Sequence, residues 1–481
     1  MIIKEGIVLR RVMSAVLAAA VCVSMAGILS GCNQGGGETG GEVDLNISAT
    51  GSEYAGDIKL PNLTAAQSEL HIMMSMSYDQ IVALETPNAP QPQVQATKIW
   101  KEAYGTDIVV DVVAENNWTE YLSTAVASGT SPDIIPASNA TFPVWSAKGL
   151  VADVDDEKFS KYLDLDDEEM GFNKELMAQF SFQGHPQWAI VEEPAKYYTV
   201  YNKTKFETQG QKTPMEYYQE GKWNWSQFVE TAKAMTDPNT GDYGFTGWML
   251  FPYTSIYPMM TLDAETGQAS LNVDNEKYVG WMTEVYNFYQ RDESGRRSWD
   301  LQNWRTTFPG GMDAMAFCLL TLDVSSYELV AKVAMELDGD EFGIAPYPIY
   351  DKGGETERIA PAYLWGYSIS SGALHPEAAA TYIRLEVLVS KNINKMIPSL
   401  GYLENVLTEE EKQMLEDTKN DKVVMEMILG MGNCYDILDT KMVPPIYYNA
   451  DETSVQAVID SVKPLLQAEV DDYNSNLAER Q

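Results

Sequence analysis

The order of apolar and polar positions predicts alternating strands and helices in the first part of the chain. Short apolar runs at residues 69–74, 107–113 and 133–135 have the length and composition of buried strands. Between these runs, residues 94–104 and 118–127 carry apolar side chains at helical spacing. Because this strand–helix–strand order is typical of a largely parallel sheet with helices on its faces, we predict an α/β fold.

The same alternation continues toward the C-terminus. It predicts strands at residues 197–201, 312–320 and 342–347, and helices at residues 225–235, 278–290, 375–388 and 452–476. Parallel sheets bind ligands beyond the carboxyl ends of their strands. Residues 75–78, and Ser138 with Asn139, follow predicted strands and are therefore candidate ligand contacts.

The first thirty residues have the pattern of a secretory signal. Basic residues precede an apolar run from Val12 to Leu29, and a positive start followed by an apolar core is typical of such signals. The sequence Leu29-Ser30-Gly31-Cys32 then resembles the lipobox of bacterial lipoproteins, in which cleavage precedes the cysteine and the thiol carries a diacylglycerol. We expect a signal peptide at 1–31 and a lipid anchor on Cys32; an uncleaved anchor helix is the alternative.

A flexible tether is predicted after the lipidated cysteine. Residues 35–41 read GGGETGG, and the chain stays polar and rich in Gly, Ser and Thr to about Ser68. Such segments behave as flexible chains, so residues 32–68 would hold a folded body away from the membrane. No later apolar run approaches membrane-spanning length.

Composition and charge exclude some classes of function. The chain has 33 Lys and Arg against 70 Asp and Glu, a formal net charge of −37. Nucleic-acid binding needs a surplus of basic side chains, so we expect no nucleic-acid partner. The 45% hydrophobic share is that of a globular protein. With 11 Trp, 27 Tyr and 13 Phe, we expect many aromatic side chains to lie outside the core, as walls of a cleft.

The sequence carries no recognisable catalytic or metal-binding pattern. The three histidines lack a second ligand at zinc spacing, and neither a P-loop nor a nucleophile elbow occurs. Residues 237–242 partly resemble a calcium loop but lack the closing Glu of an EF-hand, so a plain turn is favoured. Cys318 and Cys434 could pair outside the cell, although two free thiols are favoured. We predict no cofactor, no metal and no catalytic residue.

Nine short segments occur in a characteristic order, at residues 69–78, 104–108, 127–135, 148–153, 201–206, 223–228, 312–315, 343–348 and 375–379. The Pro-Asp-Ile step at Pro132 and the Tyr-Asn-Lys step at Tyr201 are the most specific of them. Taken together, these segments resemble the extracellular solute-binding proteins of bacterial ABC importers, in particular the sugar-binding group that includes the maltodextrin-binding proteins.

The resemblance implies a periplasmic-binding-protein type II fold, with two α/β lobes joined by hinge crossovers that close on a ligand. Chain order in the family predicts the first part of lobe 1 at 69–152, the first part of lobe 2 at 153–360, a return to lobe 1 at 361–405, and a helical C-terminal part of lobe 2 at 406–481. Such a protein is expected to be a monomer that delivers its ligand to the transmembrane subunits of an ABC permease.

The resemblance also implies which residues bind the ligand. A sugar presents C–H faces and hydroxyl groups, which suit aromatic rings and a few oriented polar groups. The positions that correspond to family contacts, or that lie beside them, are Ser138, Asn139, Trp248, Tyr253, Trp365, Tyr447 and Tyr448. Met76 is a further candidate because it lies in the loop after the first predicted strand. Core packing is the alternative for each aromatic residue. Residues 317–320 replace a Gly-Pro-Trp platform of the relatives, which argues against maltodextrin itself.

We therefore expect a lipid-anchored, extracytoplasmic solute-binding protein that captures a carbohydrate, in the first place an oligosaccharide. Two other classes stay open on the sequence alone. A cell-surface glycan hydrolase or lyase would need two carboxylates facing a cleft, and the 70 acidic residues do not exclude such a pair. A binding-protein fold used as an adhesin or as the partner of a sensor is the third reading.

Overall fold

The computed structural model describes residues 43–87, 90–190, 195–247, 257–295, 307–308, 310–320, 340–353, 358–397, 407–425, 427–448 and 454–480. Residues 43–481 form one compact unit. Among the helices described, none combines the length and the hydropathy that a membrane span requires. The predicted signal peptide and Cys32 lie outside the described residues.

A four-stranded sheet is built mainly by the first part of the chain. Its strands lie in the order β14 (Trp365–Ile369), β5 (Ile134–Ser138), β3 (Leu70–Met74) and β4 (Ile108–Val112). β3 is parallel to β4 and β5, whereas β14 is antiparallel to β5. The helices of this region are α2 (Tyr78–Val82), α3 (Pro92–Tyr104), η2 (Glu115–Asn117), α4 (Trp118–Ser128) and α5 (Val144–Ala147). The predicted strand–helix alternation is confirmed.

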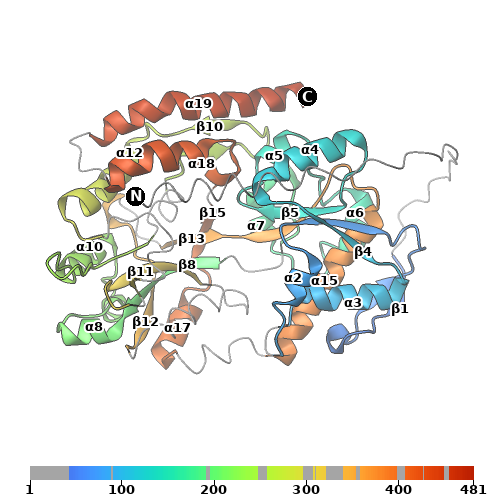
Figure 1. The fold of residues 1–481 in the computed structure, drawn as a ribbon, viewed down its shortest axis with the longest axis horizontal. Helices are drawn as coiled ribbons and strands as arrows, with labels where there is room; N and C mark the ends of the chain where they lie inside the picture. Colours follow the sequence, from blue (N-terminus) through green and yellow to red (C-terminus); the bar gives the residue numbers. More distant parts are fainter. Residues whose placement is uncertain are drawn as a thin grey trace, which may run out of the picture. The chain divides into compact units, whose positions relative to one another are not determined.

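Helix α15 (Pro376–Met396) is the most deeply buried helix beside this sheet. Its residues are buried without interruption from Ala378 to Val389. It packs against α3, β14 and α6 (Glu157–Leu163), and Figure 1 shows it beside α3 and α6. Arg384 of α15 forms an ion pair with Asp167, with 2.6 Å between Nη2 and Oδ2. The loop after α6 is thereby fixed to α15.

The segment from residue 153 to 190 lies with the four-stranded sheet. It contains α6, α7 (Lys174–Gln179), β6 (Ser181–Phe182) and β7 (His185–Pro186). At its end, Ala189 exchanges backbone hydrogen bonds with Tyr367 of β14, at 2.9 and 3.3 Å. These contacts were not foreseen from the sequence, where chain order suggested that the second lobe begins at residue 153.

The other sheet contains five of the described strands. Its order is β11 (Met315–Leu320), β8 (Ala195–Asn202), β13 (Ile359–Tyr363) and β15 (Lys422–Met425), with β12 (Phe342–Pro346) also paired to β8. β8 is antiparallel to β11, β12 and β13, whereas β13 and β15 are parallel. Three helices pack on β12: α8 (Lys203–Thr208), α9 (Pro214–Gln219) and α17 (Glu409–Asp417).

Aromatic rings fill the core beside the five-stranded sheet. The ring centroids of Trp225 in α10 (Trp225–Ala234) and Trp281 in α12 (Glu276–Tyr286) are 4.9 Å apart. Of the tryptophan side chains that the structure describes, all except Trp118 are buried. We expected the aromatic excess to line a cleft. In the described residues much of it packs in the core instead, because a buried ring removes a large apolar area from water.

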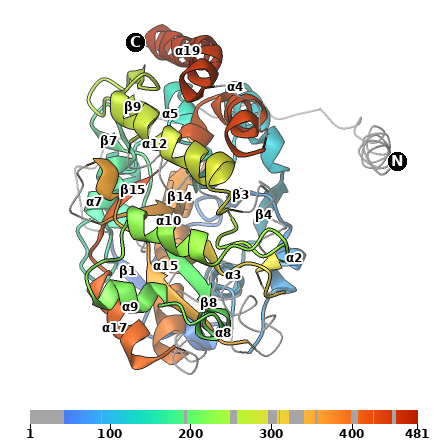
Figure 2. The same cartoon turned by 90° about the vertical axis from the view of Figure 1, so that its left-hand side faces the viewer.

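Short helices and one long helix complete the fold after β15. They are η6 (Ile428–Gly430), α18 (Cys434–Ile437), η7 (Leu438–Met442), η8 (Pro444–Tyr448) and α19 (Val455–Arg480), which contains Pro464. α19 packs against α12, α18, α5 and β10 (Ala269–Leu271), the partner of β9 (Met260–Leu262). Figures 1 and 2 both show α19 beside α12. The remaining short elements are η3 (Asn287–Arg291) and η4 (Asp351–Gly353).

Residues 43–68 form part of the folded unit. β1 (Leu45–Ser48) and β2 (Lys59–Pro61) pair antiparallel around η1 (Glu53–Ala55). The carbonyl of Tyr54 accepts a hydrogen bond from Asn392 Nδ2 of α15 at 2.9 Å. We expected a tether up to Ser68, but apolar side chains spaced among the polar residues are buried here, namely Tyr54, Ile58, Leu60 and Leu63.

Two of the motifs that carried the family resemblance have structural roles. Asn202 of the Tyr-Asn-Lys step ends β8 and caps α8, since its Oδ1 accepts a hydrogen bond from the backbone N–H of Lys205 at 2.8 Å. Asp133 of the Pro-Asp-Ile step is completely buried. Its carboxylate accepts hydrogen bonds from the backbone N–H of His71 at 3.0 Å and of His375 at 2.7 Å. Asp133 therefore joins the starts of β3, β5 and α15.

Candidate functional site

The chain passes directly from one sheet to the other at Leu364. β13 ends at Tyr363 in the five-stranded sheet, and β14 begins at Trp365 in the four-stranded sheet. Leu364 is the one residue between them, and it is buried. The two ends of a second passage lie beside the first, because Ala195 of β8 pairs with Tyr363 and Ala189 is bridged to Tyr367.

A third passage follows the end of β15, which pairs with β13 up to Met425. Gly430 of η6 then lies against the loop after β5. A β-carbon on Gly430 would stand 1.8 Å from the carbonyl oxygen of Phe142 and 2.8 Å from that of Asn139. Only a glycine allows this close backbone approach. Within the described residues, three passages therefore lie around the carboxyl end of β5.

The predicted contacts Ser138 and Asn139 lie at this junction, with exposed fractions of only 5% and 1%. Ser138 pairs with Trp365 at the end of the β5–β14 ladder, and its hydroxyl oxygen accepts a hydrogen bond from the N–H of Ala140 at 3.3 Å. Asn139 Oδ1 accepts a hydrogen bond from the N–H of Leu364 at 3.2 Å. Both side chains thus contribute to the local structure, and ligand contact by either stays a prediction.

The other predicted contacts are placed differently. Met76 is partly exposed and precedes Ser77, whose hydroxyl caps α2. Tyr447 is buried, and its ring centroid lies 4.5 Å from that of Tyr289. The positions that fall outside the described side chains are Trp248, Tyr253, Trp365 and Tyr448, although the backbones of Trp365 and Tyr448 belong to β14 and η8.

The sequence pattern did not single out Leu364 or Gly430. Leu364 lies between two strands of different sheets, and that long-range arrangement leaves no local signal. Gly430 does leave a local signal, because a glycine within the apolar run Ile428–Met431 can mark a close backbone approach. The cysteine at position 434 is a free, buried thiol, and burial raises its pKa to about 12. The side chain of Cys318 is outside the described part.

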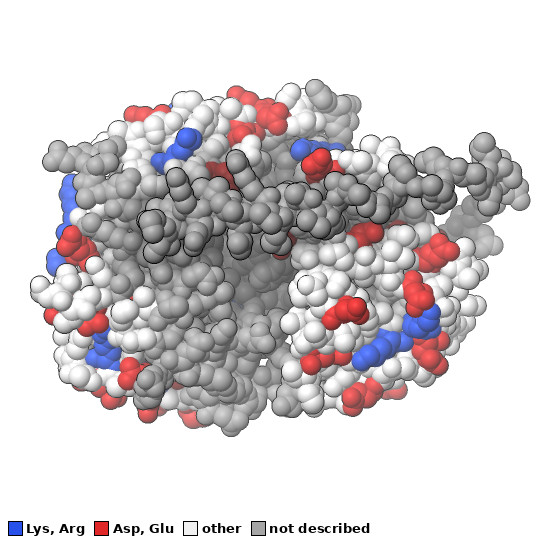
Figure 3. All heavy atoms as spheres, viewed as in Figure 1, with Lys and Arg blue, Asp and Glu red and all other residues white. Residues whose placement is uncertain are grey.

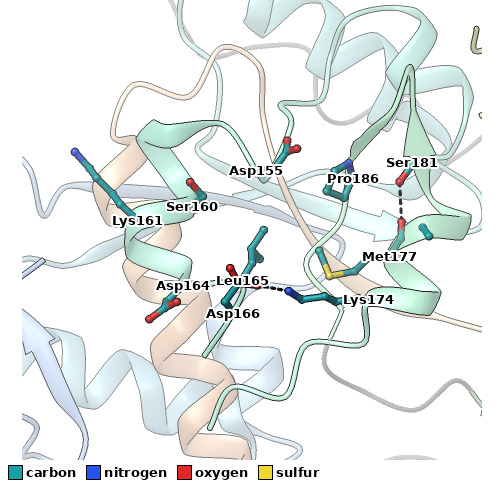
Figure 4. Close-up of a pocket in the computed structure, with 11 residues that line it drawn as sticks. Asp155, Ser160, Lys161, Asp164, Leu165, Asp166, Lys174, Met177, Ser181 and Pro186 are labelled. Atoms are coloured by element: carbon teal, nitrogen blue, oxygen red, sulfur yellow. Dashed lines mark hydrogen bonds and ion pairs between the residues drawn. The ribbon is translucent and has the colours of Figure 1, made fainter. Parts of the chain in front are cut away.

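Two cavities lined by described residues contain none of the predicted ligand contacts. One, of about 540 Å³, lies between α6, α7 and β7 and is drawn in Figure 4. Its charged lining includes an ion pair between Lys174 and Asp166. At its edge Asp155 hydrogen-bonds to His185 and so raises the pKa of the imidazole. No aromatic ring lines this cavity, so it does not suit stacking of a sugar. The other, of about 570 Å³, lies beside Tyr54 and Glu85.

The described part of the chain shows neither a basic patch on the face in Figure 3 nor a metal site. On the face shown in Figure 3, its Lys and Arg side chains form no continuous patch. No group of three or more His, Cys, Asp or Glu among the described residues is arranged to hold a metal ion. Residues 237–242 form the favoured turn, in which the backbone N–H of Asp237 donates to the carbonyl of Asp242 at 3.0 Å.

Two α/β halves, each with its own sheet and joined by several chain passages, are the architecture of two-lobed binding proteins. The sequence model of the bacterial extracellular solute-binding protein family matches residues 83–385, so this chain belongs to that family. The predicted two-lobed α/β fold and the resemblance carried by the short motifs are both confirmed. No curated protein matches the sequence.

Solved structures with this fold share little sequence with the chain. ABC substrate-binding protein Lmo0181 from Listeria monocytogenes, in complex with cycloalternan, has a TM-score of 0.57 and 16% identity, covering 85% of this chain and 99% of that one. UgpB from Mycobacterium tuberculosis, in complex with glycerophosphocholine, has a TM-score of 0.58 and 12% identity, covering 84% of this chain and 98% of that one. A periplasmic oligogalacturonide-binding protein from Yersinia enterocolitica has a TM-score of 0.55 and 13% identity, covering 85% of this chain and 100% of that one. The structural similarity establishes the fold, but at identities this low it does not identify the ligand.

Proposed function

We propose that this chain is the substrate-binding component of a bacterial ABC importer and that it captures a carbohydrate between its two lobes. The observation that carries the proposal is the family match over residues 83–385. Support for a carbohydrate comes from similar structures solved with cycloalternan, maltotetraose and acarbose. On this proposal the chain acts as a monomer and binds its ligand without converting it, and an ABC permease receives the ligand.

We propose that the lobes follow the sheets. The first lobe then includes residues 153–190, because α6 packs on α15 and Ala189 is bridged to β14. The second lobe begins with β8 at Ala195, returns to the first lobe at Leu364, and resumes with α17 and β15. This division moves the first boundary that chain order suggested from residue 152 to about residue 190.

Trp248, Tyr253 and Trp365 are the proposed aromatic contacts, and Met76, Ser138 and Asn139 the proposed contacts from the first lobe. The support for Trp365 is its position at the crossover, where β14 begins. Tyr447 and Tyr448 are weaker candidates, since Tyr447 already packs against Tyr289.

Thermal unfolding with a ligand panel tests the proposal. We expect at least one oligosaccharide at 100 times its Kd to stabilise the chain by about 2.7 kcal/mol, which raises the unfolding temperature by a few degrees. The panel includes cycloalternan, maltotetraose, oligogalacturonides, monosaccharides, peptides and glycerophosphocholine, the last because the UgpB structure is equally similar.

Two variants test whether the ligand-induced thermal shift depends on a proposed contact. Tyr253→Ala is expected to reduce the sugar-induced shift, whereas Trp118→Ala, a partly exposed position on α4, should leave it unchanged. Stabilisation by a peptide or by glycerophosphocholine, with none by any carbohydrate, would contradict the assignment to sugars while leaving the binding function in place.

We also propose that a lipid on Cys32 anchors the protein outside the cytoplasmic membrane. The compact unit that contains both sheets begins at Val43, so on this proposal residues 33–42 are the whole tether and could span at most about 35 Å. Cys32→Ser is expected to move the protein from the membrane fraction to the soluble fraction of the producing bacterium. Cys434→Ser is the matched control and should leave the protein with the membrane; equal partition of both variants would refute the anchor.

A further inference from the structure

We propose that Asn139 is a positioning residue of the hinge, which fixes the Leu364 crossover to the first lobe and so helps to set the balance between open and closed lobes. The inference rests on the proposed function only in assuming that the lobes open and close. It gives Asn139 a structural role in addition to the ligand contact proposed above.

The hydrogen bond between Asn139 and Leu364 extends the first sheet by one position. The last main-chain pair between β5 and β14 joins Ser138 to Trp365. The next residue along each strand would be Asn139 and Leu364, and here the side-chain oxygen of Asn139 replaces the main-chain acceptor, at 3.2 Å from the Leu364 nitrogen. Both residues are buried, so no water can take over as the acceptor for this N–H.

The turn that carries Asn139 is itself held firmly. The backbone N–H of Thr141 donates to the carbonyl of Ser138 at 2.9 Å, and the Thr141 hydroxyl donates to the same carbonyl at 3.0 Å. The turn therefore moves with β5. Because Asn139 fixes Leu364 to this turn, rotation of the second lobe is confined to the β13 side of Leu364.

The third passage is in close backbone contact with the same turn. The backbone of Gly430 lies so close to the carbonyls of Asn139 and Phe142 that no side chain fits between them. Two of the three passages thus meet one turn, through a side-chain amide and through a glycine. A change in either contact should therefore alter the energy of lobe rotation even when no ligand is bound.

Pulsed EPR on the ligand-free chain tests the assignment. Spin labels are placed at Glu120→Cys on α4 and Glu230→Cys on α10, both exposed and in different lobes. Cys22, Cys32 and Cys318 are replaced by serine, and buried Cys434 is kept. Asn139→Ala is expected to change the ratio of open to closed populations by about fivefold, the effect of losing one hydrogen bond. Asn139→Asp, which keeps an acceptor at the same place, should restore the parent distribution.

Asn202→Ala is the matched control, because Asn202 is equally buried and also accepts a backbone hydrogen bond, but at the far end of β8. It should destabilise the fold without changing the distance distribution. Gly430→Ala provides a second variant and should displace the mean distance. A parent-like distribution in Asn139→Ala, or an equal change in Asn202→Ala, would overturn the proposal. Since no ligand is added, neither outcome depends on whether the protein binds a carbohydrate.

Discussion

Asp133→Ala is expected to lower the free energy of unfolding by about 3–5 kcal/mol, because two backbone hydrogen bonds to a buried carboxylate are lost, at about 1.5–3 kcal/mol each. The carboxylate is completely buried and accepts hydrogen bonds from the N–H groups of His71 and His375, as well as a contact from His375 Nδ1 at 3.1 Å. Without it, two backbone donors stay buried and unpaired. Urea denaturation followed by circular dichroism measures the change.

Asp155→Ala is the control for this substitution. Asp155 also pairs with a histidine, but His185 and Asp155 are both exposed, so the change should stay within about 0.5 kcal/mol. An equal effect of the two substitutions would show that Asp133 does not join the starts of β3, β5 and α15 in the way the geometry indicates.

Trp225→Ala is expected to cost about 3–5 kcal/mol, since large aromatic side chains in a core leave a cavity when truncated. The indole is buried between Phe228 and Trp281, with ring centroids at 5.2 and 4.9 Å, and its N–H donates to Glu284 Oε2 at 3.3 Å. Urea denaturation measures this loss in the free energy of unfolding. The sugar-induced thermal shift should persist in the variant.

Trp118→Ala provides the comparison, because this indole is only partly buried. Its truncation should cost clearly less than that of Trp225. A loss of sugar binding in Trp225→Ala, with little loss of stability, would instead place this ring in a ligand site and restore the original expectation that aromatic residues form the cleft.

The parts of the fold that could be predicted from the sequence depend on local patterns. Alternation of strand-length apolar runs with helical periodicity gave the α/β class, and β3, β4 and β5 occur where the runs at 69–74, 107–113 and 133–135 placed them. The family motifs were informative for a physical reason. Asn202 caps a helix and Asp133 joins three elements, so these residue types are required by the fold.

The parts that could not be predicted depend on contacts between distant segments. The role of Asn139 follows from its position opposite Leu364, far along the chain, and the burial of Trp225 follows from the packing of α10 on α12. Aromatic composition alone cannot distinguish a core from a cleft, because the same rings serve both. Residues 43–68 were predicted as part of a tether because they are polar and rich in Gly, Ser and Thr, yet the apolar side chains among them are buried beside α15.

Isothermal titration calorimetry of the full chain, with the carbohydrate that gives the largest thermal shift, tests the central claim most directly. If the chain is a carbohydrate-binding component of an importer, we expect saturable binding of one ligand per chain and recovery of the ligand unchanged. Conversion of the carbohydrate during the titration, or the absence of saturable binding to any carbohydrate of the panel, would contradict that claim.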